Sequence, residues 1–223
     1  MNEILWVLTL ILSLAMVIVS YKFLGKIGLF LWIAIATVVA NIQTVKLVDL
    51  FGIEAALGTI LYGSTFLATD ILNLKYGKKT ARKSIVVGFY SMIIMTVFMM
   101  ICLKYAPSAN DFAQESLETI FTVNIRITIA SLIAFGVSQF VDTILFEKLQ
   151  KKFNKLWLSN NVSTMICQLI DTIIFSLITY YGLLDFSIII EIMISMYVFK
   201  VVVALMDTPF IYLSKRIKNV NEL

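Results

Sequence analysis

The sequence predicts an all-α membrane protein, a polytopic bundle of about seven transmembrane helices. Three features predict this class: 60% of the 223 residues are hydrophobic, only 14% are charged, and the hydrophobic residues occur in long runs separated by short basic stretches. A soluble domain has about 45–50% apolar and about 25% charged residues. Because only lipid can solvate so many apolar side chains in one small chain, we expect a multi-pass, integral membrane protein.

Seven apolar runs have about the 20 residues that a helix needs to cross a membrane. Two prolines and nine glycines leave few breaks in them, which favours helices. No positive segment precedes the first run and no small-residue cleavage site follows it, so we interpret it as a retained helix and not as a signal peptide. No linker divides the chain, and residues 1–223 are expected to form one transmembrane domain. The predicted helices are Ile4–Ser20, Leu29–Leu47, Ala55–Leu74, Ser84–Leu103, Asn124–Phe146, Leu158–Tyr181 and Ser187–Leu213.

Lysine and arginine residues lie in alternate connections between these helices, which predicts the orientation of the chain. Fourteen of the 18 basic residues fall in four segments, residues 22–26, 75–83, 148–155 and 215–218, while the other connections are acidic. Short connections rich in Lys and Arg stay in the cytoplasm. Seven helices place all four segments on that side, with the amino terminus outside and the carboxyl terminus in the cytoplasm. In the long outer connection, Ser108–Phe121 forms either a helix lying on the membrane or a plain loop.

The residue inventory excludes several classes of protein. The chain has no histidine and only two cysteines, Cys102 and Cys167, both inside apolar runs. A zinc or haem site, a Ser-His pair or a Cys-His pair cannot be built from these residues. No G-x-x-x-x-G-K-[ST] segment is present, so the chain itself is not expected to hydrolyse ATP. We therefore expect no catalytic residue, no metal and no cofactor, and we attribute the net charge of +4 to membrane topology and not to nucleic-acid binding.

Apart from charges near the outer ends of the predicted helices, five charged residues lie inside them, where each costs at least ~2.5–3.5 kcal/mol and needs a partner, water or a function. They are Asp70, Asp142, Asp171, Asp207 and Lys200. Asp171 and Lys200 lie near mid-helix, whereas the other three precede basic segments and would lie roughly 8–12 Å inside the cytoplasmic boundary. We expect them to line one polar chamber open to the cytoplasm, with Asp171 and Lys200 at its floor. The alternative is structural: an Asp171–Lys200 ion pair, and shallower acids paired with nearby lysines.

A short repeat supports the chamber. Gln139–Phe146 and Gln168–Phe175 both read Q-x-x-D-T-I-x-F, on helices that run in opposite directions. Gln and Asp three residues apart share one helix face, and transporters often build a midplane site from inverted repeats. A carboxylate beside a carboxamide suits the edge of a flat heterocycle with N–H donors and a carbonyl, such as guanine. Asn41 shares a face of the second helix with Thr44, and the rings of Phe140, Phe146, Phe175 or Tyr62 could stack on such a base.

Five segments resemble one known family. Ala40–Lys46 resembles the N-x-Q-x-x-K segment of the queuosine precursor transporters, also called vitamin uptake transporters. Tyr62–Arg82 is similar to the family's third helix, except that Asn73 stands where an acid is usual. The two Q-x-x-D-T elements and Asp207-Thr208-Pro209 also look like family features, and the resemblance spans about residues 38–213.

The resemblance implies an importer of 7-deazaguanine compounds, the precursors of the modified tRNA nucleoside queuosine, in a bacterial cytoplasmic membrane. The substrate would be 7-cyano-7-deazaguanine, 7-aminomethyl-7-deazaguanine or the queuine base. The expected partners of the protein are this base and the lipid bilayer, with no nucleic acid. An assembly of identical copies is left open. Asn73 could tune the choice among the precursors. The expected substrate-binding residues are Asp142, Asp171, Gln139, Gln168, Asp70, Asn41, Lys200, Asn73 and Asp207.

Three other functions remain open from the sequence. The chain could be the substrate-binding membrane subunit of a multi-component vitamin importer, which would need separate ATP-hydrolysing partners. It could be an intramembrane enzyme, although no Asp-rich metal segment or serine placed to meet Lys200 is evident. It could also be a structural membrane protein whose buried ion pairs serve packing alone.

Overall fold

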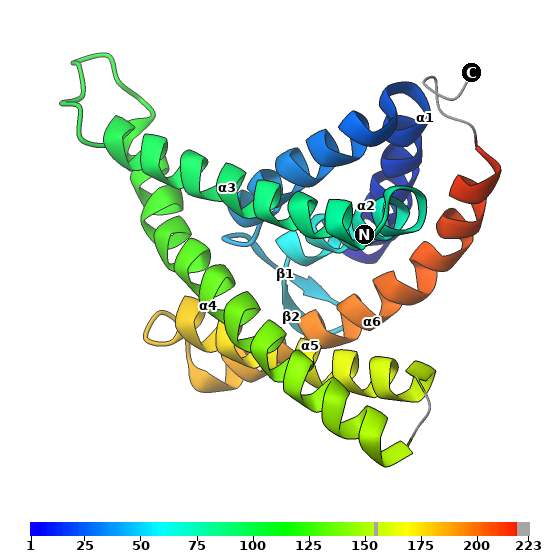
Figure 1. Ribbon diagram of the computed structural model, residues 1–223. Coiled ribbons are helices and arrows are strands. Elements are labelled where there is room, and N and C mark those ends of the chain that lie inside the picture. Colours follow the sequence, from blue (N-terminus) through cyan, green and yellow to red (C-terminus); the bar gives the residue numbers. More distant parts are fainter. Residues whose placement is uncertain (154–155, 218–223) are drawn as a thin grey trace.

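The computed structural model describes residues 1–153 and 156–217 of the chain, apart from some side chains between residues 139 and 164 and that of Thr208. The described residues form six helices and one two-stranded hairpin (Figure 1). The elements are α1 (Asn2–Gln43), β1 (Leu47–Leu50), β2 (Ile53–Ala56), α2 (Gly58–Tyr76), α3 (Lys78–Cys102), α4 (Gln114–Phe153), α5 (Leu156–Tyr180) and α6 (Phe186–Arg216). The predicted all-α membrane class is confirmed.

Helix α1 is two helices joined at a sharp break. Its 42 residues would span about 63 Å if straight, twice the ~30 Å hydrocarbon core of a bilayer. Gly25 has φ 57° and ψ −134°, a conformation that only glycine adopts easily. A Cβ on Gly28 would lie 2.2 Å from the Ser20 carbonyl oxygen, so the chain packs closely as it turns. The two halves run in different directions (Figure 1) and correspond to the first two predicted helices.

A β-hairpin that the sequence did not predict follows α1. Strands β1 and β2 are antiparallel, with Leu47 opposite Ala56 and Leu50 opposite Ile53. Phe51 and Gly52 form the turn with φ values of 55° and 80°, the positive pair that a type I′ turn requires. The second predicted helix therefore ends early, at Gln43 instead of residue 47, and the third begins at Gly58 instead of residue 55.

The connection between α3 and α4 is an irregular loop. Residues 103–113 form no helix, and Leu117 and Phe121 belong to the first turns of α4. Asp111 Oδ1 accepts hydrogen bonds from the amides of Ala113 (2.7 Å) and Gln114 (3.2 Å), which starts α4 at this point. Neither prediction holds for the whole segment: residues 108–113 form a loop, whereas residues 114–121 are helical as the start of α4 and not as a separate surface helix.

Apolar helices and exposed apolar side chains match a lipid environment. Within the described residues, four helical segments are long and apolar enough to cross a membrane, namely α1, α3, residues 114–138 of α4, and α6. Met165–Tyr180 in α5 is a shorter apolar segment. Large hydrophobic side chains such as Val86, Phe98 and Leu205 are at least 66% exposed, which a soluble protein would avoid over so many positions.

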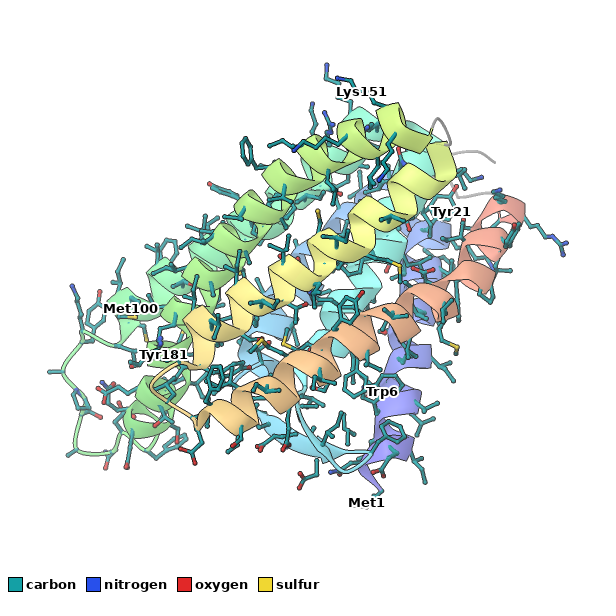
Figure 2. All side chains as sticks on the ribbon, turned by 90° about the horizontal axis from the view of Figure 1, so that it is seen from below. Met1, Trp6, Tyr21, Met100, Lys151 and Tyr181 are labelled. Atoms are coloured by element: carbon teal, nitrogen blue, oxygen red, sulfur yellow. The ribbon has the colours of Figure 1, made fainter. Side chains whose placement is uncertain are left out.

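Two hydrophobic clusters form the core, and α6 contributes to both. One cluster joins α1, α2 and the second half of α6, where Gly63 of α2 packs against Val203 so closely that a Cβ would lie 2.9 Å from Val203 Cγ1. The other joins α4, α5 and the first half of α6 through Ile127, Phe175 and Ile192. Figure 2 shows α5 and α6 side by side in this second cluster. The candidate site lies where the two clusters meet.

Candidate functional site

A cavity lies between the two clusters and has two adjoining lobes. The first lobe has a volume of about 50 Å³, and the second about 240 Å³. The second lobe comes close to the lower end of the range of about 300–1,000 Å³ that is typical of small-molecule sites, and the first lobe is a smaller extension of it. Four residues line both lobes, Thr37, Tyr62, Phe89 and Asp171. The lobes are therefore parts of one site, walled by α1, α2 and α3 on one side and by α4, α5 and α6 on the other.

An ion pair stands at the wall of the cavity. Lys200 Nζ of α6 donates hydrogen bonds to Asp171 Oδ2 (2.8 Å) and to Thr172 Oγ1 (3.0 Å) of α5. Thr172 Oγ1 in turn donates to the Gln168 carbonyl oxygen (2.8 Å). The Lys200 side chain is only 8% exposed and that of Asp171 is 24% exposed. A buried ammonium group needs such a partner, so Asp171 holds Lys200 while keeping one edge open to the cavity.

Two unpaired carboxamide oxygens lie in the walls, one in each lobe. Asn41 lines the first lobe and Gln168 the second. Asn41 Nδ2 donates to the Thr37 carbonyl oxygen (2.8 Å), which fixes the amide, but Asn41 Oδ1 and Gln168 Oε1 are buried without a described hydrogen-bond partner. A buried acceptor left unpaired costs about 1–3 kcal/mol. A ligand that carries N–H groups would therefore be stabilised at both positions.

Aromatic and sulfur-bearing side chains cover much of the remaining wall. Tyr62 packs edge-on against Phe66 with ring centroids 5.7 Å apart, and Phe89 packs against Phe135 at 4.7 Å. The first lobe adds Met92, Phe175 and Met196. Flat apolar faces with few polar groups are the usual lining of a site for a planar ring.

The end of the first lobe nearest the hairpin is closed by hydrogen bonds. Tyr180 Oη donates to the Thr44 carbonyl oxygen (3.2 Å), and Ser195 Oγ donates to the Glu54 carbonyl oxygen (3.0 Å). The Glu54 amide donates to Glu191 Oε2 (3.3 Å). These contacts tie the hairpin and the end of α1 to α5 and α6.

The structure brings together some of the residues expected to bind substrate. Asp171, Gln168, Asn41 and Lys200 line the cavity, and the expected proximity of Asp171 and Lys200 is confirmed. The side chains of Gln139 and Asp142 lie outside the described residues, as does that of Phe146. Their convergence with Asp171 stays a prediction.

The remaining expected residues lie away from the two lobes. Asp70 and Asn73 are exposed and Asp207 is buried, and none of them lines either lobe. Asp70 and Asp207 are near enough to each other to interact electrostatically. Phe140, suggested for stacking, is 69% exposed and lines neither lobe, whereas Phe175 and Tyr62 do line the cavity.

Sequence reasoning missed several residues of the cavity. Thr172 was visible as part of the repeated D-T pair, but its bond to Lys200 depends on how α5 and α6 pack. Thr37 and Phe89 carry no signal, because a Thr or Phe in an apolar helix is usual. Cys167 was interpreted as a buried thiol; it is buried, and it also lines the second lobe.

Comparisons with known proteins add independent information. A family model described as "Putative vitamin uptake transporter" matches residues 56–214. A "Probable queuosine precursor transporter" of Bacillus subtilis is 40% identical over 96% of this chain and 95% of its own length. A protein of the same description from Haemophilus influenzae is 30% identical over 60% of this chain and 56% of its own. The "Queuosine precursor transporter" of Escherichia coli is 26% identical over 72% of this chain and 70% of its own. No solved structure matches the chain.

Proposed function

The chain belongs to the vitamin uptake transporter family, and on that premise we propose that it imports a queuosine precursor across a bacterial cytoplasmic membrane. The observation that carries the proposal is the 40% identity to a protein of that description over 96% of the chain. A cavity with aromatic and polar lining, placed between two packed helix clusters, would give the chain a site for such a molecule.

Seven membrane passes within a single domain form part of the proposal, with α1 supplying two of them. The basic segments of the sequence support this topology, and so does the placement of the helix ends. Met1, Met100 and Tyr181 lie toward one end of the molecule in Figure 2, and Tyr21 and Lys151 toward the other. Helices that cross the membrane in alternating directions would place these five residues at the two ends in this way, with the lysine-rich end in the cytoplasm.

The precursors are flat guanine-like bases, and the cavity offers matching groups. Asp171 and the unpaired oxygens of Asn41 and Gln168 would accept hydrogen bonds from the N–H groups of the base. Tyr62 and Phe89, which line both lobes, would pack against its faces.

The remaining polar residues would complete the site. Gln139 and Asp142 would extend its polar edge from α4. Lys200 would hold the Asp171 carboxylate in place, because its ammonium group lies 2.8 Å from that carboxylate. Since an ammonium group has three donors, Lys200 would also be able to donate to a carbonyl oxygen of the base.

The local electrostatics favour an uncharged ligand. Lys200 and Asp171 neutralise each other at 2.8 Å, and among the side chains that the structure describes, the others that line the two lobes carry no formal charge. A neutral base would then enter without desolvating an unpaired charge, which costs several kcal/mol in a buried site. With no ATP-binding segment in the sequence, transport would follow the gradient of the base or that of an ion.

Purified protein in liposomes tests this function directly. The full chain, reconstituted alone, should accumulate a labelled 7-deazaguanine precursor, and Asp171→Asn should abolish uptake per folded molecule. Asp49→Asn, which removes the same charge from the exposed hairpin, is the matched control and should leave uptake intact. Uptake that needs added ATP-hydrolysing partners would support a multi-component importer instead. Failure of every precursor in vesicles, and in a strain whose tRNA queuosine depends on uptake, would refute the assignment.

A further inference from the structure

A second recess lies at the start of α3, away from the transport cavity. It has a volume of about 350 Å³ and is lined by Lys78, Lys79, Arg82, Lys83 and Val86. The two ion pairs in the described part of the chain, Met1 with Glu3 and Lys200 with Asp171, involve none of these residues. Four cations therefore surround one opening without a described acidic partner.

The recess leads directly into an apolar stripe on the same helix face. Residues 79, 83, 86, 90 and 97 recur at helical spacing. Val86 (66% exposed), Tyr90 (64%) and Val97 (50%) are the apolar members. The step from residue 86 to residue 97 is about 16 Å along the helix, close to half of the ~30 Å hydrocarbon core. One helix face thus presents cations at the depth of lipid headgroups and apolar side chains along one leaflet.

We propose that this surface binds an anionic phospholipid of the leaflet that faces the basic end of the molecule. The phosphate would sit in the recess, where Arg82 can donate two parallel hydrogen bonds and the lysines supply point charges. One acyl chain would lie along Val86, Tyr90 and Val97. A free phosphate would use only the recess and would leave the apolar stripe uncovered, so the stripe favours a lipid.

The location makes the site accessible. Residues 78, 79, 82, 83, 86 and 90 are all exposed in the folded chain, and α3 carries Met100 at its opposite end, which places the recess at the end of the molecule where Lys151 lies (Figure 2). Ser84 and Gly88 are buried, so the other face of the helix packs against the rest of the protein. The cationic face is therefore held toward the lipid and not toward the core.

Retention of defined lipids by the purified full chain tests the proposal. Native mass spectrometry would compare phosphatidylglycerol with phosphatidylcholine of the same acyl chains. Each cationic side chain near an anionic surface contributes about 1 kcal/mol, so R82Q/K83Q should weaken phosphatidylglycerol retention about 30-fold. Phosphatidylcholine retention should not change. R82K/K83R keeps both charges but removes the paired donors of Arg82, so phosphatidylglycerol retention should fall less than in R82Q/K83Q.

The control is K148Q/K151Q, which removes two exposed charges from another basic segment at the same end of the molecule. Equal loss of phosphatidylglycerol in this control would mean general electrostatic attraction and would overturn the proposal. Displacement of the lipid by millimolar inorganic phosphate would show a free-anion site and would overturn it too. If R82Q/K83Q does not fold, R82Q and K83Q are measured singly, and wild-type retention in both would refute the site.

Discussion

Lys200 Nζ lies 2.8 Å from Asp171 Oδ2, and this contact joins α5 to α6 at the wall of the cavity. Asp171 lines both lobes, and Lys200 lines the first. The pair therefore has two roles to distinguish, one in holding the helices together and one in presenting a carboxylate to a ligand.

Single and double substitutions of this pair separate the two roles. Lys200→Met leaves an unpaired carboxylate and Asp171→Asn leaves an unpaired buried ammonium, each of which should destabilise the protein by up to about 3–5 kcal/mol. The double variant K200M/D171N should recover most of the thermal stability but none of the uptake. Unfolding in detergent and uptake in liposomes measure the two quantities. Recovery of uptake in the double variant would show that the pair is purely structural.

Thr172 is expected to position Lys200 through its hydroxyl group. Thr172→Val keeps the shape but removes the 3.0 Å hydrogen bond to Lys200 Nζ. A hydrogen bond to a charged group contributes about 1.5–3 kcal/mol, so we expect a KM for uptake at least several-fold higher, while Thr172→Ser should restore it. Thr179→Val is the control, because Thr179 is a buried threonine of the same helix whose Oγ1 has no described partner. An equal effect in both variants would argue against the positioning role.

Asn41 is expected to contribute more to substrate binding than to the stability of the fold. Its Oδ1 is buried without a described partner, so Asn41→Leu removes an unpaired acceptor along with one hydrogen bond to Thr37, and the stability should change by less than about 1 kcal/mol. Uptake should nevertheless fall at least roughly tenfold, the usual cost of a lost hydrogen bond to a ligand. Asn124→Leu tests the specificity of the effect, because Asn124 is also buried with an unpaired Oδ1 but lines neither lobe. The idea fails if N41L transports like the wild type.

Gly63 allows α2 to approach α6, and a larger residue should force them apart. A Cβ at this position would lie 2.9–3.3 Å from three atoms of Val203, so Gly63→Ala should cost about 1–3 kcal/mol by overpacking. Val203→Ala in the same chain should recover part of that loss. Gly136→Ala is the control, since a Cβ on Gly136 would meet no atom within 4 Å in the described part of the chain. It should be neutral or slightly stabilising, because alanine favours helix over glycine. Thermal unfolding of the three variants measures these differences, and equal stability of G63A and G136A would contradict the close packing.

Cys167 reports on occupancy of the second lobe. Its buried side chain lines that lobe, whereas Cys102 is exposed at the far end of α3. In a C102S chain, a small maleimide should modify Cys167 slowly, and a guanine-like precursor should slow it further by several-fold. In a C167S chain, modification of Cys102 should not respond to the precursor. Equal protection of both thiols, or of neither, would contradict occupancy of this lobe.

Several features of this protein are determined by sequence alone. The excess of apolar residues and the alternation of basic segments specify a helical membrane protein. Both features can be recognised from the composition of each segment, because long apolar segments need lipid as their solvent. The approximate helix positions follow from the same runs. The mid-helix placement of Asp171 and Lys200 made their pairing predictable, since an isolated charge at that depth is too costly to remain unpaired.

Other features depended on tertiary packing. The hairpin of β1 and β2 is held by hydrogen bonds with α6. The break at Gly25 depends on the close approach of the two halves of α1, and the cavity depends on the spacing of the two clusters. Sequence periodicity describes which face of each helix is polar, but not which partner that face meets. That is why Thr37 and Phe89 gave no signal, and why Asp70 and Asp207, similar to Asp171 in sequence, lie outside the two lobes.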